Sequence, residues 1–272
     1  SVLKEAGRLE EAETTCRQAI ALQEDNAEVH SNLGAILCEL GRKKDAIEIF
    51  RKTLELQPGN SVAKHMLSSL LGQTTKTAPL DYIETLFDRY ADNFENSLKN
   101  ELEYEIPEII FEVIKDFNKC DFIDSILELG CGTGLFGQIM KPHCNHLVGI
   151  DISERMLEKA KAKNVYDKLI QQDIESYLSN SELSYDYFIS TDVFIYVGDL
   201  FDVFRLIKTR NKKSGFFIFS TEDIEGYDFY LRSSGRYAHS KSYIDFLCEK
   251  FSYECLYFDT RNLRKEKDGY IK

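Results

Sequence analysis

The chain has 272 residues, of which 43% are hydrophobic, and a formal net charge of −12 at pH 7 that falls almost entirely in residues 79–272. This length accommodates one domain of about 150 to 200 residues and a smaller module. An acidic domain disfavours a DNA or RNA substrate, since neutralisation of phosphates drives nucleic-acid binding, and no apolar stretch is long enough to span a bilayer. Neither nucleic acid nor a membrane is therefore expected as a partner.

Seven cysteines, at positions 16, 38, 120, 131, 144, 248 and 255, show no paired spacing. This usage favours free thiols in a reducing compartment, so we expect the chain to be cytoplasmic. His143, Cys144 and His146 are close enough in sequence to suggest a metal site. Nothing else at zinc spacing accompanies them, so we expect a surface connection and no metal.

An internal period of 34 residues organises the first quarter of the chain. Residues 27–60 form one unit, in which the small residues Gly34 and Ala46 let two helices approach closely and Pro58 ends the second. This unit resembles a tetratricopeptide repeat. Residues 1–26 resemble the back part of an earlier repeat, and residues 61–71 resemble the first helix of the next, with Ser68 where a glycine would stand.

The resemblance implies paired antiparallel helices over residues 1–71, with a concave face that binds a peptide or a partner protein. A purely structural extension is the alternative. Because such arrays need three or more units and the chain opens inside a repeat without a Met, we expect a fragment of a longer array.

Residues 72–79 are polar, end in proline and predict a linker, so the second domain is expected over residues 80–272. Directly after the linker, Tyr82, Phe87, Tyr90 and Phe94 recur at helical spacing. This pattern predicts a helix that packs its aromatic side chains onto a core.

The run Ile126-Leu-Glu-Leu-Gly-Cys-Gly-Thr-Gly134 predicts a buried strand that ends in a glycine loop. Gly130, Gly132 and Gly134 let the backbone turn tightly and approach a ligand that a Cβ would exclude. A helix over residues 135–140 would direct its free N–H groups toward that loop. The order of strand, loop and helix predicts a cofactor site.

Two classes of cofactor fit this sequence pattern. Residues 132–137 satisfy the dinucleotide pattern G-x-G-x-x-G, with Asp151 placed to hold a ribose, so a nicotinamide-dependent oxidoreductase is one alternative. That alignment puts Gly130 inside the strand, where a bulky apolar residue is expected. The G-x-G-x-G alignment instead leaves Glu128 at the carboxyl end of the strand, where a carboxylate suits a positively charged ligand and opposes a pyrophosphate.

In the second alignment the chain resembles the class I S-adenosylmethionine-dependent methyltransferases, whose first strand and loop are similar to residues 127–134. The resemblance implies an α/β fold with a Rossmann-like seven-stranded sheet. Acidic residues close four successive expected strands, namely Glu128, Asp151, Asp173 and Asp192. The fifth strand is expected at residues 216–220, the sixth at 252–258, and the last, at 269–272, looks incomplete.

The resemblance implies roles for individual residues. Asp151 would accept hydrogen bonds from the ribose hydroxyls, and Ile152 and Asp173 would contact the adenine. The full cofactor-binding set that it implies is Tyr90, Glu128, Gly130, Cys131, Gly132, Gly134, Asp151, Ile152, Met156, Asp173 and Ile174. An Asp after a strand is also a common turn or helix cap, and Tyr90 also fits plain packing, so these alternatives stay open.

Residues 231–240 follow the fifth expected strand, where insertions in this family often build the acceptor pocket. Arg232 and Arg236 can bind a carboxylate or phosphate bidentately, which predicts an anionic small molecule or a carrier-linked acyl group, with Tyr196 also in the substrate site. His239 is the first candidate for a general base, ahead of Tyr237 and Asp192. An ordinary loop whose arginines pair with nearby carboxylates is the alternative.

We therefore predict a methyltransferase that uses S-adenosylmethionine and carries helical repeats for a partner. A non-catalytic scaffold that keeps the donor-binding residues is the rival from another class. The Asn/Asp-Pro-Pro-aromatic signature of enzymes that methylate adenine or glutamine is missing, because Thr191-Asp-Val-Phe-Ile-Tyr196 stands in its place. The acceptor itself is not identified by the sequence.

Overall fold

The computed structural model describes residues 8–98, 104–117, 122–180, 182–260, 264–266 and 269–271. These residues form two compact units. The first contains the described residues up to Tyr82 together with Leu231–Arg236, and the second contains the remainder. The segment 72–79, expected as a linker, lies within the first unit, which also takes in a short segment from far along the chain.

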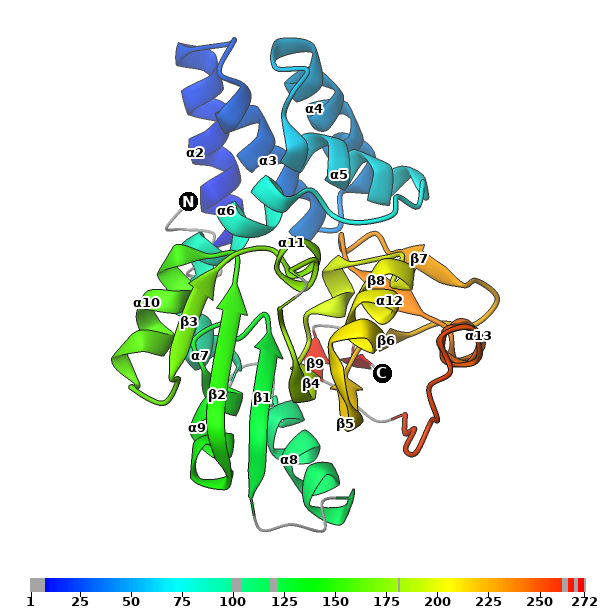
Figure 1. Cartoon of the computed structure of the whole chain (residues 1–272). Coiled ribbons are helices and arrows are strands. Elements are labelled where there is room, and N and C mark those ends of the chain that lie inside the picture. The colour runs from blue at the N-terminus through cyan, green and yellow to red at the C-terminus, as the bar shows by residue number, and fades with distance from the viewer. Residues whose placement is uncertain are drawn as a thin grey trace. The chain divides into compact units, whose positions relative to one another are not determined.

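Successive helices of the first unit pack against one another (Figure 1). They are α2 (Leu9–Leu22), α3 (Ala27–Glu39), α4 (Lys43–Leu56) and α5 (Ser61–Leu71), and α6 (Leu80–Tyr90) begins in this unit. Asn26 and Asn60, which lie one repeat apart, cap α3 and α5 by accepting hydrogen bonds from the N–H groups of Val29 and Ala63. The period of the sequence is thus a period of helix starts.

Gly34 and Phe50 determine how closely α3 and α4 approach. A Cβ at Gly34 would lie 2.6 Å from Cε1 of Phe50, whose side chain is completely buried. Only glycine leaves room for this ring. The close approach predicted for the two helices is confirmed.

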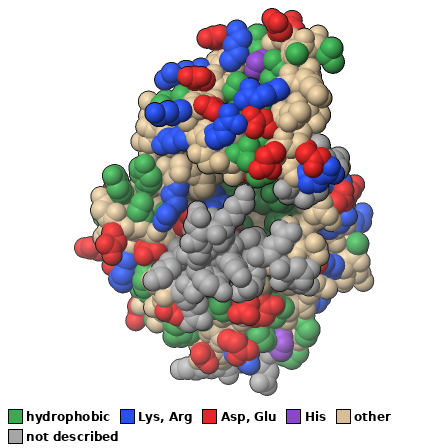
Figure 2. Space-filling view, turned by 180° about the vertical axis from the view of Figure 1, so that it is seen from behind, with side chains coloured by type: hydrophobic (Ala, Val, Ile, Leu, Met, Phe, Trp, Pro, Cys, Tyr) green, Lys and Arg blue, Asp and Glu red, His purple; other side chains and the backbone are tan. Residues whose placement is uncertain are grey.

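The outer surface of the repeat helices mixes charges of both signs, as the upper part of Figure 2 shows. Arg42 contacts Glu13 at 2.8 Å and Asp45 at 2.5 Å, and Arg17 also contacts Glu13 at 2.8 Å. Exposed pairs of this kind contribute about 0 to 1 kcal/mol each. Buried apolar side chains, including Leu33, Ile36 and Phe50, therefore hold the repeats together.

The second unit alternates strands and helices in α/β order. Its strands are β1 (Ile123–Leu129), β2 (Cys144–Asp151), β3 (Lys168–Gln171), β4 (Tyr185–Ser190), β5 (Asn211–Phe219), β6 (Glu222–Asp223), β7 (Phe229–Leu231), β8 (Tyr237–His239), β9 (Arg264–Glu266) and β10 (Gly269–Ile271). Its helices are α7 (Phe94–Asn96), α8 (Ile106–Phe117), α9 (Leu135–Met140), η2 (Lys141–His143), α10 (Glu154–Ala162), α11 (Ile174–Leu178), η3 (Phe194–Tyr196), α12 (Phe201–Arg210) and α13 (Lys241–Phe251).

The main sheet has five parallel strands in the order β3-β2-β1-β4-β5 (Figure 1). Its central strand is buried on both faces: Ile126 packs with α8 and α9, and Leu127 packs with α11, α12 and α13. The strand order reverses between β1 and β4, and ligands of open α/β sheets bind at such a switch point, beyond the carboxyl ends of the strands. The glycine loop begins there.

The prediction of a sixth strand at residues 252–258 is wrong. After α13 the chain turns through Ser252, which has a left-handed φ of +54°, and residues 253–260 form no ladder with a neighbouring strand. Leu256, Tyr257 and Phe258 remain 45% to 47% exposed. Their alternation resembles that of a strand, but a strand also needs a partner for its backbone groups. The chain ends instead in a separate antiparallel pair, β9 and β10.

Across the described segments, no helix has both the length and the apolar character that crossing a membrane requires.

Candidate functional site

The glycine loop leaves the sheet where β1 ends, at Leu129. Gly130, Gly132 and Gly134 all have left-handed backbones, with φ values of +72°, +51° and +82°. The strand therefore stops before Gly130, as the G-x-G-x-G alignment requires. The dinucleotide alignment, which extends the strand through Gly130, does not describe this backbone.

Hydrogen bonds and close contacts fix the shape of the loop. The N–H groups of Gly130 and Cys131 both donate to the carbonyl oxygen of Ile150, at 2.9 Å each, and tie the loop to β2. A Cβ on Gly130 would lie 2.5 Å from Cγ2 of Val193. Thr133 follows with a buried hydroxyl that has no hydrogen-bond partner among the described residues. The loop backbone thus forms a polar cradle, and side chains in place of the glycines would fill it.

Glu128 lies at the carboxyl end of β1 and is only 1% exposed. Its Oε2 accepts a hydrogen bond from the hydroxyl of Tyr166 at 2.7 Å. Burial raises the pKa of Glu128 to about 8; the bond from Tyr166 and the charge of Lys163 lower it, while the charge of Asp151 raises it. A cation beside this carboxyl would favour its ionised form, so the site suits a positively charged group.

Tyr166 was missed by the sequence analysis. A Cβ at Gly137 would lie 2.4 Å from Cζ of the Tyr166 ring, and a Cβ at Gly149 would lie 2.9 Å from its Cε1. The ring fills the space that these two glycines leave open. Tyr166 itself belongs to no local pattern, so the available signal was the pair of glycines on α9 and β2.

Asp151 ends β2 and contacts the glycine loop directly. Its Oδ2 accepts from the N–H of Gly132 at 2.8 Å, and its Oδ1 accepts from the N–H of Ser153 at 2.9 Å. Burial raises the pKa of Asp151 to about 6, although these backbone bonds lower it. An ionised carboxylate has about four acceptor positions, so capacity remains for the hydroxyls of a diol.

The other predicted cofactor residues lie in varied surroundings. Asp173 caps α11 through a 2.9 Å bond from the N–H of Ser176, which is the helix-cap alternative raised by the sequence. Met156 is completely buried, and burial raises the pKa of the buried Cys131 thiol. Ile152 and Ile174 are partly buried. Their contacts with a cofactor stay predictions.

Polar contacts fasten the segment from Asp88 to Glu95, which contains the start of α7, to α10. These contacts are Asp88–Ser153 at 2.5 Å, Asp92–Arg155 at 2.5 Å, Asp92–Lys159 at 2.8 Å and Glu95–Lys163 at 2.6 Å. Three of the four join opposite charges. The segment, which we call the strap, is thereby held beside the loop.

Phe94 is the aromatic residue of the strap that reaches the glycine loop. A Cβ on Gly132 would lie 3.7 Å from Cε1 of Phe94, whereas Tyr90 is 45% exposed. Phe87 packs edge-on against both Phe94 and Tyr196, with ring centroids 6.1 Å and 5.3 Å apart. This aromatic cluster joins the strap to η3, beyond β4, and includes the predicted substrate residue Tyr196.

The predicted general base His239 is a buried histidine with several hydrogen bonds. Its Nε2 lies 2.9 Å and 2.8 Å from the carbonyl oxygens of Val197 and Gly198, and its Nδ1 lies 2.6 Å from Oγ1 of Thr221. Since carbonyls only accept, Nε2 carries the proton and Nδ1 accepts from the threonine. Burial lowers the pKa of His239 to about 4. This geometry gives His239 a structural role and lends no support to its assignment as a base.

The remaining acceptor-site candidates are dispersed. Asp192 has a left-handed φ of +57°, and its N–H donates to Oγ of Ser220 at 2.8 Å. Tyr237 is completely buried in β8. Arg232 and Arg236 belong to the compact unit of the repeats, while Tyr237 and His239 belong to the other unit. The structure therefore divides the segment that the sequence treated as one loop.

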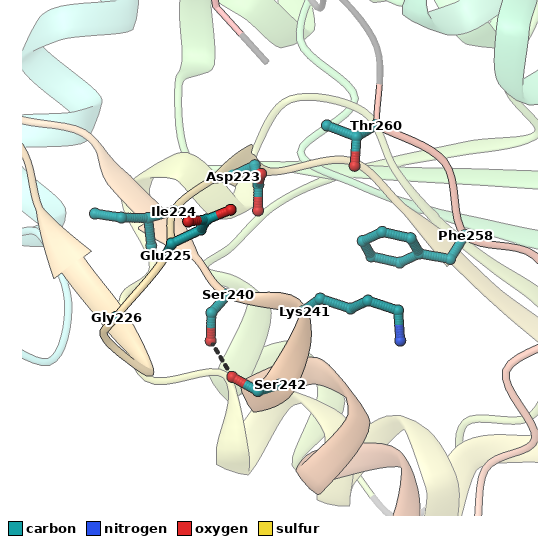
Figure 3. A pocket seen from close by; sticks show the side chains of 9 residues that line it. All are labelled: Asp223, Ile224, Glu225, Gly226, Ser240, Lys241, Ser242, Phe258 and Thr260. Carbon is teal, nitrogen blue, oxygen red and sulfur yellow. Dashed lines mark hydrogen bonds between the residues drawn. The ribbon is translucent and has the colours of Figure 1, made fainter.

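A pocket of about 360 Å³ opens near the start of α13 (Figure 3). Two carboxylates, Asp223 and Glu225, face it from the segment after β5, and Phe258 closes the side opposite them. Lys241 lies over the Phe258 ring, but its Nζ also binds both carboxylate oxygens of Asp245, at 2.8 Å and 2.6 Å. The positive charge of Lys241 is therefore already paired with a carboxylate that does not line the pocket.

Both parts of the chain match models of known protein families. Residues 124–269 match the model of the methyltransferase domain, and residues 3–70 match that of the tetratricopeptide repeat.

Two curated relatives and one solved structure show the range of similarity. The malonyl-[acyl-carrier protein] O-methyltransferase of Hamiltonella defensa is 28% identical over 141 residues, which are 51% of each chain. Malonyl-[acyl-carrier protein] O-methyltransferase 1 of Ilyobacter polytropus is 36% identical over 115 residues, 40% of this chain and 42% of the relative. The chain thus spans about half the length of the curated relatives that it matches.

The N-methyltransferase NodS of Bradyrhizobium japonicum, solved with S-adenosyl-L-homocysteine, aligns with a TM-score of 0.50 at 18% identity. The alignment covers 61% of this chain and 84% of NodS. At this identity the likeness concerns the fold.

Proposed function

Because this chain belongs to the methyltransferase domain family, we propose that it transfers a methyl group from S-adenosylmethionine to an acceptor nucleophile. The observation that carries the proposal is the convergence of Glu128, the glycine loop and Asp151 at the switch point of the sheet. When bound, the donor would supply an electrophilic methyl group on a sulfonium.

The residues present fit that donor. The left-handed backbone at Gly130, Gly132 and Gly134 leaves a cradle that Cβ atoms would fill, and Thr133 brings a buried hydroxyl with no partner among the described residues. Asp151 would hold the ribose hydroxyls. Glu128 would face the cationic end, where its ionised form is favoured.

The protein would act through position and electrostatics. Asp151 remains anchored by two backbone N–H groups, and Tyr166 fixes the orientation of Glu128. Both carboxylates are therefore held in place before a ligand binds. The strap, with Phe94 beside Gly132, would exclude water from the loop.

For the acceptor we propose an anionic, carrier-linked acyl group. Two relatives named malonyl-[acyl-carrier protein] O-methyltransferases support this choice. A carboxylate acceptor carries its own nucleophilic oxygen and needs little help from a general base, which agrees with the buried, neutral state of His239.

The pocket of Figure 3 favours a second candidate, an amine acceptor. Asp223 and Glu225 present carboxylates, and Phe258 presents an aromatic ring, which together suit a cation. The anionic acceptor would be repelled by the same two side chains. The two candidates therefore predict opposite substrate charges.

Methyl transfer with a labelled donor tests the proposal. We expect label on malonyl-carrier protein and none on the unacylated carrier, while label on a small amine would select the second candidate. Donor binding without transfer to either acceptor would contradict both and favour the non-catalytic scaffold.

A further inference from the structure

The strap carries a row of acidic side chains that faces a row of basic side chains on α10. The acidic residues are Asp88, Asp92 and Glu95. The basic residues recur every four positions from the start of α10 to its C-cap and are Arg155, Lys159 and Lys163. Side chains at this spacing share one face of a helix. Both rows belong to the same compact unit of the chain.

Ion pairs join the two rows. Asp92 contacts Arg155 at 2.5 Å and Lys159 at 2.8 Å. Hydrogen bonds from Lys159 and Arg155 lower the pKa of Asp92 below its usual range, which keeps this carboxylate ionised near neutral pH. Glu95 contacts Lys163 at 2.6 Å, and the side chain of Lys163 is only 14% exposed. The strap is thus fastened to α10 by charge.

Ser153 anchors the beginning of the strap next to Asp151. The hydroxyl of Ser153 donates to Oδ1 of Asp88 at 2.5 Å, and its N–H donates to Oδ1 of Asp151 at 2.9 Å. Ser153 is completely buried. Arg155 adds a hydrogen bond from Nη1 to the backbone carbonyl oxygen of Asp88, at 2.9 Å. The residue that holds the carboxylate proposed to bind the ribose therefore also holds the strap.

Apolar packing contributes little to the attachment of the strap. Among its residues, all of which the structure describes, Ala91 alone is buried. Asp92 and Asn93 are exposed, and Phe94 is partly buried. A segment with few buried apolar contacts opens locally at a low cost in free energy. Exposed ion pairs are weak and are screened by salt, so they hold such a segment without fixing it permanently.

Release of the strap would uncover the glycine loop. A Cβ on Gly132 would lie 3.7 Å from Cε1 of Phe94. The residues that pair with α10, Asp92 and Glu95, lie on either side of Phe94 in the sequence. Separation of these ion pairs would therefore free the Phe94 ring from the loop that is proposed to hold the donor.

We propose that the strap is an electrostatic latch on the donor site, and that its ion pairs with α10 separate when the donor enters and when its demethylated product leaves. This inference rests on the proposed methyl transfer from S-adenosylmethionine. The ion pairs join parts of the chain and involve no donor atom, so they stabilise the closed strap by the same amount in the free and the bound chain. Weakening them accelerates association and dissociation together and leaves the Kd nearly unchanged.

Three variants of the full chain test the latch. Asp92→Asn removes the charge that pairs with Arg155 and Lys159, while Asp92→Glu retains it. Asp202→Asn is the matched control, because Asp202 forms a 2.8 Å ion pair with Arg205 on α12 and its side chain is 55% exposed, close to the 58% of Asp92. The control removes the same charge from an ion pair that does not include the strap.

Surface plasmon resonance with the immobilised chain measures kon and koff for S-adenosyl-L-homocysteine. We expect Asp92→Asn to raise both rate constants about fivefold while the Kd stays within about twofold of the parent value, and Asp92→Glu to reverse most of the change. Asp202→Asn should match the parent. Unchanged rate constants in Asp92→Asn, a raised Kd with an unchanged kon, or equal acceleration by Asp202→Asn would overturn the latch.

Salt tests the latch in the unmodified chain. Raising NaCl from about 0.05 M to about 0.5 M weakens exposed ion pairs, so koff of the parent should rise about threefold. Asp92→Asn has already lost the pairs with Arg155 and Lys159 and should show a smaller rise, while Asp202→Asn should follow the parent. The same salt dependence of koff in Asp92→Asn and the parent would overturn the electrostatic origin of the latch.

Hydrogen exchange distinguishes failure of the latch from failure of the proposed function. The N–H of Asn93 donates to the carbonyl oxygen of Tyr90 at 3.0 Å, and the N–H of Ser97 donates to that of Asn93 at 2.9 Å. With no ligand added, exchange at these amides should accelerate about fivefold in Asp92→Asn and stay near the parent value in Asp202→Asn. A chain that binds neither S-adenosylmethionine nor its product would contradict the proposed function. Equal exchange in Asp92→Asn and the parent would instead show that the ion pairs do not hold the strap.

Discussion

The hydroxyl of Tyr166 donates to the buried carboxyl of Glu128 at 2.7 Å, and this bond links β1 to the connection between α10 and β3. It is the one side-chain hydrogen bond that the structure gives Glu128 within the described residues. Burial nevertheless dominates and raises the pKa of Glu128 to about 8. In the donor-free chain Glu128 is therefore mostly protonated at neutral pH.

This state predicts a pH dependence of donor binding. A cationic ligand favours the ionised carboxylate, so the donor association constant should rise from about pH 6 to pH 8 and level off above it, approaching tenfold per pH unit for one linked proton. Glu128→Gln should flatten this rise. Calorimetric titrations of the parent and Glu128→Gln at several pH values provide the measurement, and Asp151 is present in both proteins. Parallel profiles would show that Glu128 does not face the cationic end.

Folding stability should also depend on pH through the ionisation of Glu128. The pKa of Glu128 is raised in the folded chain above its ordinary 4.5. Its contribution to the free energy of unfolding is therefore fully present below pH 4.5 and is lost as the pH rises through about 8. Glu128→Gln should lose this part of the decline. Urea unfolding of both proteins at pH 5 and pH 8 measures the difference, and an equal decline in the two would contradict the assignment.

Gly130→Ala tests the cradle. Its Cβ would lie 2.5 Å from Val193 at a φ of +72°. Gly41 has nearly the same φ, +73°, but its Cβ would meet nothing within 4 Å, so Gly41→Ala is the matched control. We expect about 1 to 2 kcal/mol of destabilisation from the backbone in both, and a further 1 to 3 kcal/mol, roughly, from overlap in Gly130→Ala alone.

Chemical denaturation and donor titration of both glycine variants complete that test. Donor affinity should fall in Gly130→Ala and stay unchanged in Gly41→Ala. Similar stability and affinity in the two variants would mean that the loop tolerates a side chain at position 130.

The strap predicts which aromatic residue matters to the donor. Phe94 lies beside Gly132, while Tyr90, the residue chosen from the sequence, is 45% exposed. Phe94→Ala should weaken donor binding about tenfold by removing an aromatic contact. Tyr90→Ala should change the affinity less than twofold. The reverse order would restore the sequence-based choice of Tyr90.

The strand, glycine loop and helix could be predicted because their signals are local. An apolar run, glycines at left-handed positions and an apolar helix follow one another within residues 126–140. The repeats were equally readable, since Asn26 and Asn60 cap helices one period apart. Periodicity and backbone conformation are properties of neighbouring residues, and the sequence states them directly.

Contacts between segments that are distant in sequence could not be predicted from the sequence. Nothing near Tyr166 indicates that it bonds Glu128, and nothing in residues 231–236 indicates that they contact α5. His239 was expected to titrate near neutrality because burial cannot be read from its neighbours in sequence. The prediction of a sixth strand was wrong for a related reason. An alternating sequence pattern predicts a strand only where the edge of a neighbouring strand is available for pairing.

Calorimetric titration of the chain with S-adenosylmethionine, and separately with NAD, tests the central claim most directly. We expect one molecule of S-adenosylmethionine to bind, no binding of NAD, and a loss of about 2 to 3 kcal/mol in Asp151→Ala, the scale of hydrogen bonds to a charged group. Binding of NAD in place of the methyl donor, or a folded Asp151→Ala that binds the donor as tightly as the parent, would contradict the account.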